Sequence, residues 1–326
     1  MKRKSVKTRT VPKNRCYFCY EALGSGDIDY HPTCARKLFP GHSTPPTVEV
    51  GMDDIQNFAK EVVNQRLVVT GVQRKLSLGM EREGPGSTRL TIVGWNSHYI
   101  LKPPHEKFPE LPEIEDLCMH FSEICKIKTA RHGLVPLKTG ELAYISKRFD
   151  RPKKKKKLPV EDLCQLMGFL TEDKYQGSME KVGKIIRKYS SNPGVDAVTF
   201  FDLALLCFLI GNADMHLKNF SLLTDEQDFV SLAPAYDLVS TALVMPRDNE
   251  ESALPLNGKK SNLTRKDFIA LGENLDLPEK VIEKSFARMG SNVEPMLNLI
   301  PQSFLSKEMQ KKFESLFQER ADRLTL

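Results

Sequence analysis

The sequence predicts an α+β protein with a β-rich N-terminal lobe, a helical C-terminal lobe and a small cysteine-rich module ahead of both. From residue 67 to residue 103, short β-branched or alternating apolar runs are separated by turn residues, which is typical of an antiparallel sheet. From about residue 160 onward, apolar residues recur at helical spacing. A set of three cysteines and one histidine near the N-terminus indicates the additional module.

Composition and charge limit the class of protein. The chain has 326 residues, of which 40% are hydrophobic, and a formal net charge of +6; this is enough for about two domains with a sizeable core. Residues 1–15 hold seven Lys or Arg and no acid, and residues 153–157 are five lysines. Such runs are usually solvated, and contact with nucleic acid or an acidic partner is the alternative.

The chain gives no sign of a membrane protein. No apolar stretch approaches the roughly 20 residues of a membrane span, and no hydrophobic segment follows the basic N-terminus. We therefore expect a cytoplasmic protein that has no membrane partner. In keeping with that compartment, four cysteines lie in apolar helical contexts and are expected to be ordinary buried thiols, namely Cys118, Cys125, Cys164 and Cys207.

The remaining cysteines have the spacing of a metal site. Cys16 and Cys19 form Cys-x2-Cys, and after eleven residues His31 and Cys34 form His-x2-Cys. Three thiolates and one imidazole suit tetrahedral Zn²⁺, and four protein ligands leave no position for water. We expect a structural, zinc-ribbon-like site, the alternative being free thiols beside a surface histidine.

Composition changes along the chain predict the domain organisation. Three prolines in residues 40–50 indicate a linker after the cysteine-rich module. The predicted parts are a basic tail (1–15), the Cys3His module with its linker (16–48), the N-lobe (49–147) and the C-lobe (148–326).

Periodicity predicts the individual elements. In the N-lobe we expect a helix over 52–66, a strand, loop and strand over 67–80, strands within 89–95 and 98–104, a helix over 111–127 and a strand over 141–151. In the C-lobe we expect a β-hairpin over 220–240 and helices over 160–170, 179–189, 199–211, 266–275, 278–289 and 308–324.

The polar stretch "NADMHLKN" follows an apolar helix and contains Asp214 and Asn219 with the spacing Asp-x4-Asn. This is the spacing of a kinase catalytic loop, where the Asp accepts the proton of the attacking hydroxyl and the Asn binds Mg²⁺. The predicted hairpin would return Asp237 beside Asn219 as a second metal-binding carboxylate.

Further parts of a phosphoryl-transfer site occur in the expected order. Lys102 ends a predicted strand, and Glu115 lies on the next predicted helix, where it could pair with Lys102. The segment "TGVQRK" is the candidate phosphate-covering loop: Thr70, Gly71, Val72, Gln73, Arg74 and Lys75.

These motifs together resemble the HipA-type serine/threonine kinases, and most closely the shorter HipT-type toxins. The resemblance runs from about residue 51 to the C-terminus and includes "TGVQRKLSL", "YILKPP", "RFDR", "GNADMHLKNFSLL" and "LAPAYDLVS". It implies a two-lobed kinase fold, ATP-dependent phosphorylation of Ser or Thr, and aminoacyl-tRNA synthetases as a target class. It also implies a bacterial toxin bound by a HipB-like or HipS-like antitoxin, with DNA contacted only through the antitoxin.

The resemblance also implies residue roles. Asp214 would be the catalytic base, Asn219 and Asp237 the Mg²⁺ ligands, and Lys102 a ligand of the ATP phosphates. The resemblance places further ATP-binding residues in the catalytic loop, at the hinge and beside the metal-binding Asp: His216, Lys218, Lys147, Arg148, Phe149 and Tyr236.

Two departures from the family pattern matter. Where the short toxins carry two phosphorylatable serines ahead of the loop glycine, this chain has Val68 and Thr70, so loop self-inhibition would depend on Thr70 alone. The N-terminal subdomain of the long HipA type is absent, and the cysteine-rich module stands in its place. We hypothesise that this module substitutes for that subdomain or for a HipS-like protein.

Two other functions fit parts of the sequence. Asp214, His216 and Asn219 form Asp-x-His-x-x-Asn, which also occurs in phosphoinositide-kinase-like loops, so a lipid or small-molecule kinase is the nearest alternative. A zinc-dependent nucleic-acid-binding regulator could use the cysteine-rich module and the lysine runs on phosphates.

Overall fold

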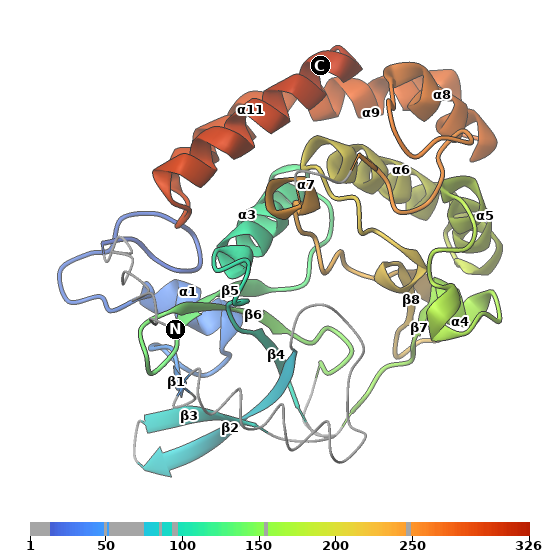
Figure 1. The fold of residues 1–326 in the computed structure, drawn as a ribbon. Helices are drawn as coiled ribbons and strands as arrows, with labels where there is room; N and C mark the ends of the chain where they lie inside the picture. Colours follow the sequence, from blue (N-terminus) through green and yellow to red (C-terminus); the bar gives the residue numbers. More distant parts are fainter. Residues whose placement is uncertain are drawn as a thin grey trace, which may run out of the picture.

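The computed structural model describes residues 14–48, 51, 75–84, 87–92, 97–152, 156–245 and 249–326. A sheet-rich lobe and a larger helical lobe are plain in Figure 1, and this confirms the predicted α+β, two-lobed class. The predicted helix over 52–66, Thr70–Arg74 of the predicted loop, and most of the basic tail lie outside the described residues. Within the described part, no helix combines the length and apolarity needed to cross a membrane.

The N-lobe sheet holds Lys102 on a central strand. Among the described residues it has six strands in the order β1-β3-β2-β4-β6-β5, antiparallel except where β1 joins β3. The strands are β1 (Thr47–Val48), β2 (Leu76–Gly84), β3 (Ser87–Ile92), β4 (Tyr99–Lys102), β5 (His132–Pro136) and β6 (Leu142–Lys147). Lys102 is opposite Tyr144 of β6.

Helix α3 (Leu111–Ile124) lies between this sheet and the helical lobe (Figure 1). It packs against β5 and β6, and Phe121 contacts the rings of Phe313 and Phe317. Because α3 is covered on several sides, its acidic residues Glu115 and Asp116 are fully buried. Buried carboxylates require charged or hydrogen-bonding partners, and both have them.

The cysteine-rich module, residues 14–46 with α1 (Pro32–Leu38), packs on the edge strand β5. The amide of Leu134 donates to the Tyr17 carbonyl (3.0 Å), and the Tyr30 hydroxyl donates to the Leu134 carbonyl (2.6 Å). Gly133 permits this approach, since a Cβ there would lie 2.9 Å from the Tyr30 hydroxyl. The module thus covers an edge that would otherwise expose unpaired backbone groups. The predicted linker is itself structured, since it contributes β1 to the sheet.

The C-lobe is built around α6 (Pro193–Leu209), whose residues from Phe200 to Leu209 are all buried. The helices around it are α5 (Met179–Tyr189), α7 (Thr241–Val244), α8 (Arg265–Asn274), α9 (Glu279–Ser291), α10 (Val293–Leu299) and α11 (Lys307–Leu324).

A small sheet lies beside α6. In the described chain it has the order β7-β8-β9, with β7 (Val160–Asp162), β8 (Ser221–Thr224) and β9 (Val230–Leu232). The predicted hairpin therefore forms as β8 and β9. The predicted helix over 160–170 was wrong at its start, because residues 160–162 pair with β8. Only α4 (Leu163–Leu166) is helical there, and Asp162 caps it by accepting from the Gln165 amide.

Candidate active site

The catalytic-loop sequence begins with a sharp turn after α6. Gly211 has φ +68°, and a Cβ there would lie 2.9 Å from Ala242 and Leu316 atoms, so only glycine fits. The Asn212 side chain accepts from the Asp214 amide (3.1 Å), and the Thr241 hydroxyl accepts from the Ala213 amide (2.8 Å). The backbone that presents Asp214 is therefore fixed from two sides.

Asp214 and Asn219 lie together in this loop. The Asn219 side-chain amide donates to the Asp214 carbonyl (3.0 Å), and the His216 amide donates to the same oxygen (2.9 Å). The Asp214 carboxylate accepts a hydrogen bond from the Tyr175 hydroxyl (2.8 Å). Tyr175 is 46% exposed and Asp214 is half-buried, so this contact lies near the surface.

His216 and Lys218 differ in their surroundings. His216 is buried with its ring edge-on to Tyr175, and burial lowers its pKa, so the imidazole is neutral near pH 7. Its Nδ1 has no hydrogen-bond partner within the described residues. The Lys218 ammonium lies 2.7 Å from Asp162 Oδ2, so in this structure it is engaged by that carboxylate.

Asp237 is the centre of a charged cluster that joins the lobes. Its carboxylate binds the ammonium of Lys75 (2.8 Å) and the ammonium of Lys102. Lys102 also binds Glu115 Oε1 (2.5 Å), the pairing that the sequence predicted. Lys75 precedes β2 and Lys102 ends β4, so two N-lobe lysines meet one C-lobe carboxylate, and Glu115 on α3 joins the cluster through Lys102.

Local structure ties Asp237 to the catalytic loop. Asp237 has φ +60°, a left-handed conformation that Asp tolerates better than most residues. Its neighbour Tyr236 donates to the Lys218 carbonyl (2.9 Å), and the Ser221 and Tyr236 hydroxyls lie 2.6 Å apart. The segment that carries Asp237 is therefore bonded directly to the loop that carries Asn219.

The electrostatics of the cluster follow from burial and pairing. Burial alone would raise the pKa of Asp237, but Lys102 and Lys75 outweigh burial and hold the pKa well below its usual range. Burial would lower the pKa of Lys102, yet the carboxylates of Asp237 and Glu115 raise it. For Glu115 burial dominates over Lys102 and raises the pKa from 4.5 to about 7.

The predicted hinge, Lys147 to Phe149, begins at the last residue of β6 and connects the lobes. The Arg148 guanidinium binds Asp150 through two hydrogen bonds (2.9 and 2.7 Å), and it also donates to the Ser97 hydroxyl (3.2 Å). The Phe149 ring packs on Tyr236, with ring centroids 5.7 Å apart. Burial, and then Arg131, lower the pKa of Lys147. The segment is thereby anchored beside the residues around Asp237.

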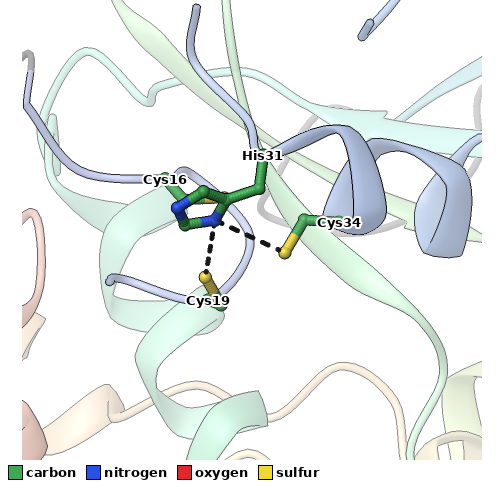
Figure 2. A group of neighbouring side chains, drawn as sticks. All are labelled: Cys16, Cys19, His31 and Cys34. Carbon is green, nitrogen blue, oxygen red and sulfur yellow. Dashed lines mark hydrogen bonds between the residues drawn. The ribbon is translucent and has the colours of Figure 1, made fainter. Parts of the chain in front are cut away.

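The four predicted metal ligands of the cysteine-rich module converge (Figure 2). One ligand atom from each of Cys16, Cys19, His31 and Cys34 lies within 4.8 Å of the others. His31 Nδ1 is 3.4 Å from Cys19 Sγ and 3.8 Å from Cys34 Sγ. A tetrahedral zinc ion with its usual bond lengths separates sulfur and nitrogen ligands by roughly 3.5 Å. His31 Nε2 lies 2.9 Å from the Ala22 carbonyl, the kind of outer partner that orients a metal-binding imidazole.

Sequence reasoning missed residues that contact the candidate site. Tyr175, Asp162 and Asn212 contact Asp214 or Lys218 from loops or short elements. Asn212 lies within the polar stretch and could have been singled out as a turn residue. No periodic or spacing signal connects Tyr175 with Asp214, because the two are 39 residues apart in the chain.

Comparison with known proteins agrees with this architecture. Residues 67–297 match the HipA-like C-terminal domain family. A putative kinase of Haemophilus influenzae is 29% identical over 270 residues, covering 74% of this chain and 77% of that protein. Putative kinase Y4dM of Sinorhizobium fredii is 28% identical over 274 residues, covering 79% of this chain but only 63% of that relative.

Two solved structures share the fold. HipA of Shewanella oneidensis, in a complex with HipB and operator DNA, superposes with a TM-score of 0.66 at 20% identity, covering 82% of this chain and 71% of that one. The kinase CtkA of Helicobacter pylori superposes with a TM-score of 0.53 at 17% identity, covering 76% of this chain and 93% of that one. Since the family match spans well over half of the sequence, this chain belongs to the HipA-like kinase family.

Proposed function

We propose that this protein is an ATP-dependent serine/threonine protein kinase of the HipA/HipT type. The observation that supports this best is the cluster of Asp237 with Lys75, Lys102 and Glu115, bonded through Tyr236 to the loop of Asp214 and Asn219. Phosphoryl transfer depends on positioning and on electrostatic stabilisation, which a rigid cluster of this kind supplies.

The residues fit Mg²⁺ and ATP. Lys75 and Lys102 keep the Asp237 carboxylate ionised, so it can offer an anionic oxygen to a cation, and Asn219 adds an amide oxygen of the kind Mg²⁺ prefers. When bound, Mg²⁺ would neutralise charge on the phosphate oxygens. Asp214 accepts the proton of the attacking hydroxyl, and Lys102 binds the phosphates.

The remaining predicted residues complete the ATP site in this proposal. Residues 70–75 cover the phosphates, with Lys75 already at Asp237. The adenine ring of ATP binds against Tyr236 and the hinge, Lys147 to Phe149. Neutral His216 shapes the loop, and Lys218 would have to leave Asp162 to reach the γ-phosphate.

We also propose a structural zinc ion bound by Cys16, Cys19, His31 and Cys34. Four protein ligands close the site to water, so the ion would stabilise the fold and take no part in the reaction. The module has only one short helix, α1, and metal binding would contribute much of its folding free energy.

In the cell, the proposed kinase acts in the cytoplasm as the toxin of a toxin–antitoxin system. Its proposed target is a translation component such as an aminoacyl-tRNA synthetase, and its partner is a HipB-like or HipS-like antitoxin that alone contacts DNA. The Shewanella neighbour, a HipA in complex with HipB and operator DNA, supports such a partner. If the cysteine-rich module replaces a partner subunit, zinc-loaded and zinc-stripped chains should differ in antitoxin affinity; equal affinities would argue against this role.

Labelled ATP tests the substrate class. Wild-type protein with Mg²⁺ is given a cell protein extract or mixed lipid vesicles, and Asp214→Asn and Asp228→Asn are run in parallel. Asp228 is an exposed turn residue and serves as the control. We expect label on protein Ser or Thr, lost in Asp214→Asn and kept in Asp228→Asn. Label in lipid alone would instead support the lipid-kinase alternative.

A further inference from the structure

A second cluster of metal-binding residues lies in the N-lobe, apart from the cysteines. Asp116 and His120 are one turn apart on α3, and His132 begins β5. Their exposed fractions are 0%, 9% and 1%. One ligand atom from each of the three residues lies within 4.8 Å of the other two.

Both imidazoles turn one nitrogen toward Asp116. His132 Nδ1 lies 2.6 Å from Asp116 Oδ1, and His120 Nε2 lies 3.6 Å from Asp116 Oδ2. His120 Nε2 is buried and has no hydrogen-bond partner among the described residues. A buried nitrogen without a partner costs free energy unless something else binds it.

The opposite nitrogens of both rings face Glu123. His120 Nδ1 lies 3.2 Å from Glu123 Oε2, and His132 Nε2 lies 3.8 Å from Glu123 Oε1. In metal sites, a ligating histidine typically donates its other N–H to a carboxylate, which fixes the ring and its tautomer. Glu123 is placed to serve His120 in this way, whereas His132 Nε2 is beyond hydrogen-bond distance of Glu123 and has no hydrogen-bond partner among the described residues.

We propose that Asp116, His120 Nε2 and His132 Nδ1 form a second metal site, which takes one borderline divalent ion of the zinc class. Imidazole and carboxylate ligands suit such an ion. Its two positive charges would balance the negative charges of Asp116 and Glu123 with both histidines neutral. The ion would supply the partner that His120 Nε2 lacks among the described residues.

This site would attach the cysteine-rich module to α3. The Tyr20 hydroxyl donates to Asp116 Oδ2 (2.8 Å), and the Tyr20 ring packs edge-on against His120 with centroids 4.6 Å apart. Tyr20 directly follows Cys19, and Asp116 directly follows Glu115. An ion at Asp116 would therefore rigidify the contact between the module and the helix that positions Lys102.

The competing account places a proton between Asp116 and His132 and needs no metal. Native mass spectrometry of the full chain with added Zn²⁺ separates the two accounts, using wild type, His120→Gln, Cys19→Ser and the control His105→Gln. We expect two zinc ions on wild type and on the control, and one on each of the other variants. A single ion on wild type, kept by His120→Gln and lost by Cys19→Ser, would overturn the proposal.

Co²⁺ substitution identifies which site is filled. The cysteine site gives an intense thiolate-to-cobalt charge-transfer band, whereas a site with nitrogen and oxygen ligands gives only weak visible bands. We expect Cys19→Ser to lose the intense band and to keep the weak ones. Loss of all cobalt bands in Cys19→Ser, with circular dichroism unchanged, would contradict the second site. Should His120→Gln misfold, the wild-type zinc stoichiometry still decides.

Discussion

We expect Glu115 to position Lys102 and, at the same time, to lower the stability of the folded protein. It is fully buried, and its Oε2 has no hydrogen-bond partner among the described residues. Burial raises its pKa from 4.5 to about 7 even with Lys102 beside it. Because the folded pKa exceeds the unfolded one, the folded state binds this proton more tightly, and stability falls as pH rises from about 4.5 to 7.

The size of this effect follows from the pKa difference. At about 1.4 kcal/mol for each pKa unit, ionised Glu115 lowers the free energy of unfolding by about 3 kcal/mol above pH 7. Glu115→Gln keeps the shape and removes the charge. We expect its advantage in stability over wild type to grow with pH, from about 1 kcal/mol near pH 5 to about 3 kcal/mol near pH 8.

Urea unfolding at several pH values between 5 and 8 measures this difference, with the exposed Glu294→Gln as control. In the same variant, phosphoryl transfer should decrease, because Lys102 keeps only Asp237 as a partner. If Glu115→Gln is instead less stable than wild type at pH 8, the ion pair with Lys102 stabilises the folded state by more than the burial of ionised Glu115 destabilises it. That result would refute the reasoning.

Three further substitutions test the site and its support. Lys102→Met should slow single-turnover phosphoryl transfer roughly 100-fold. The control Lys138→Met, on the exposed turn after β5, should leave the rate unchanged. Equal rates for the two variants would show that Lys102 takes no part in phosphoryl transfer. Tyr175→Phe removes the hydroxyl that donates to Asp214 and competes with the substrate hydroxyl for that carboxylate. Loss of one such hydrogen bond predicts that steady-state kcat/KM for a protein substrate rises about fivefold. A fall in kcat/KM would mean that Tyr175 aids catalysis. Gly133→Ala should lower the free energy of unfolding, measured in urea, by about 1–3 kcal/mol, because the added Cβ clashes with the Tyr30 hydroxyl. Gly194→Ala places its Cβ in open space and should leave the free energy of unfolding unchanged.

The lobes and most of the charged cluster could be predicted because their signals are local. Lys102 ends an apolar strand and Glu115 follows on an amphipathic helix, so their meeting depends on two adjacent elements. Asp214 and Asn219 lie within one short loop. For such residues, spacing along the chain largely determines distance in space.

Contacts between distant segments could not be predicted. The two-residue strand β1 has no periodicity, and its parallel pairing with β3 depends on the packing of the whole module. Residues 160–162 have a helical pattern but pair with β8, because backbone pairing outweighed local preference. The burial of Asp116 beside His132 likewise required the module to cover α3.

The most direct test of the central claim is Mg²⁺-dependent transfer of labelled γ-phosphate from ATP to protein, compared between wild type, Asp237→Asn and Asp228→Asn. Asp237 and Asp228 have nearly the same positive φ, +60° and +59°, so both substitutions are made at positions with a positive φ. The proposed function predicts transfer by wild type and Asp228→Asn, and loss of transfer in Asp237→Asn. Equal transfer by all three proteins would contradict the role of Asp237, and no transfer by wild type would contradict the kinase assignment.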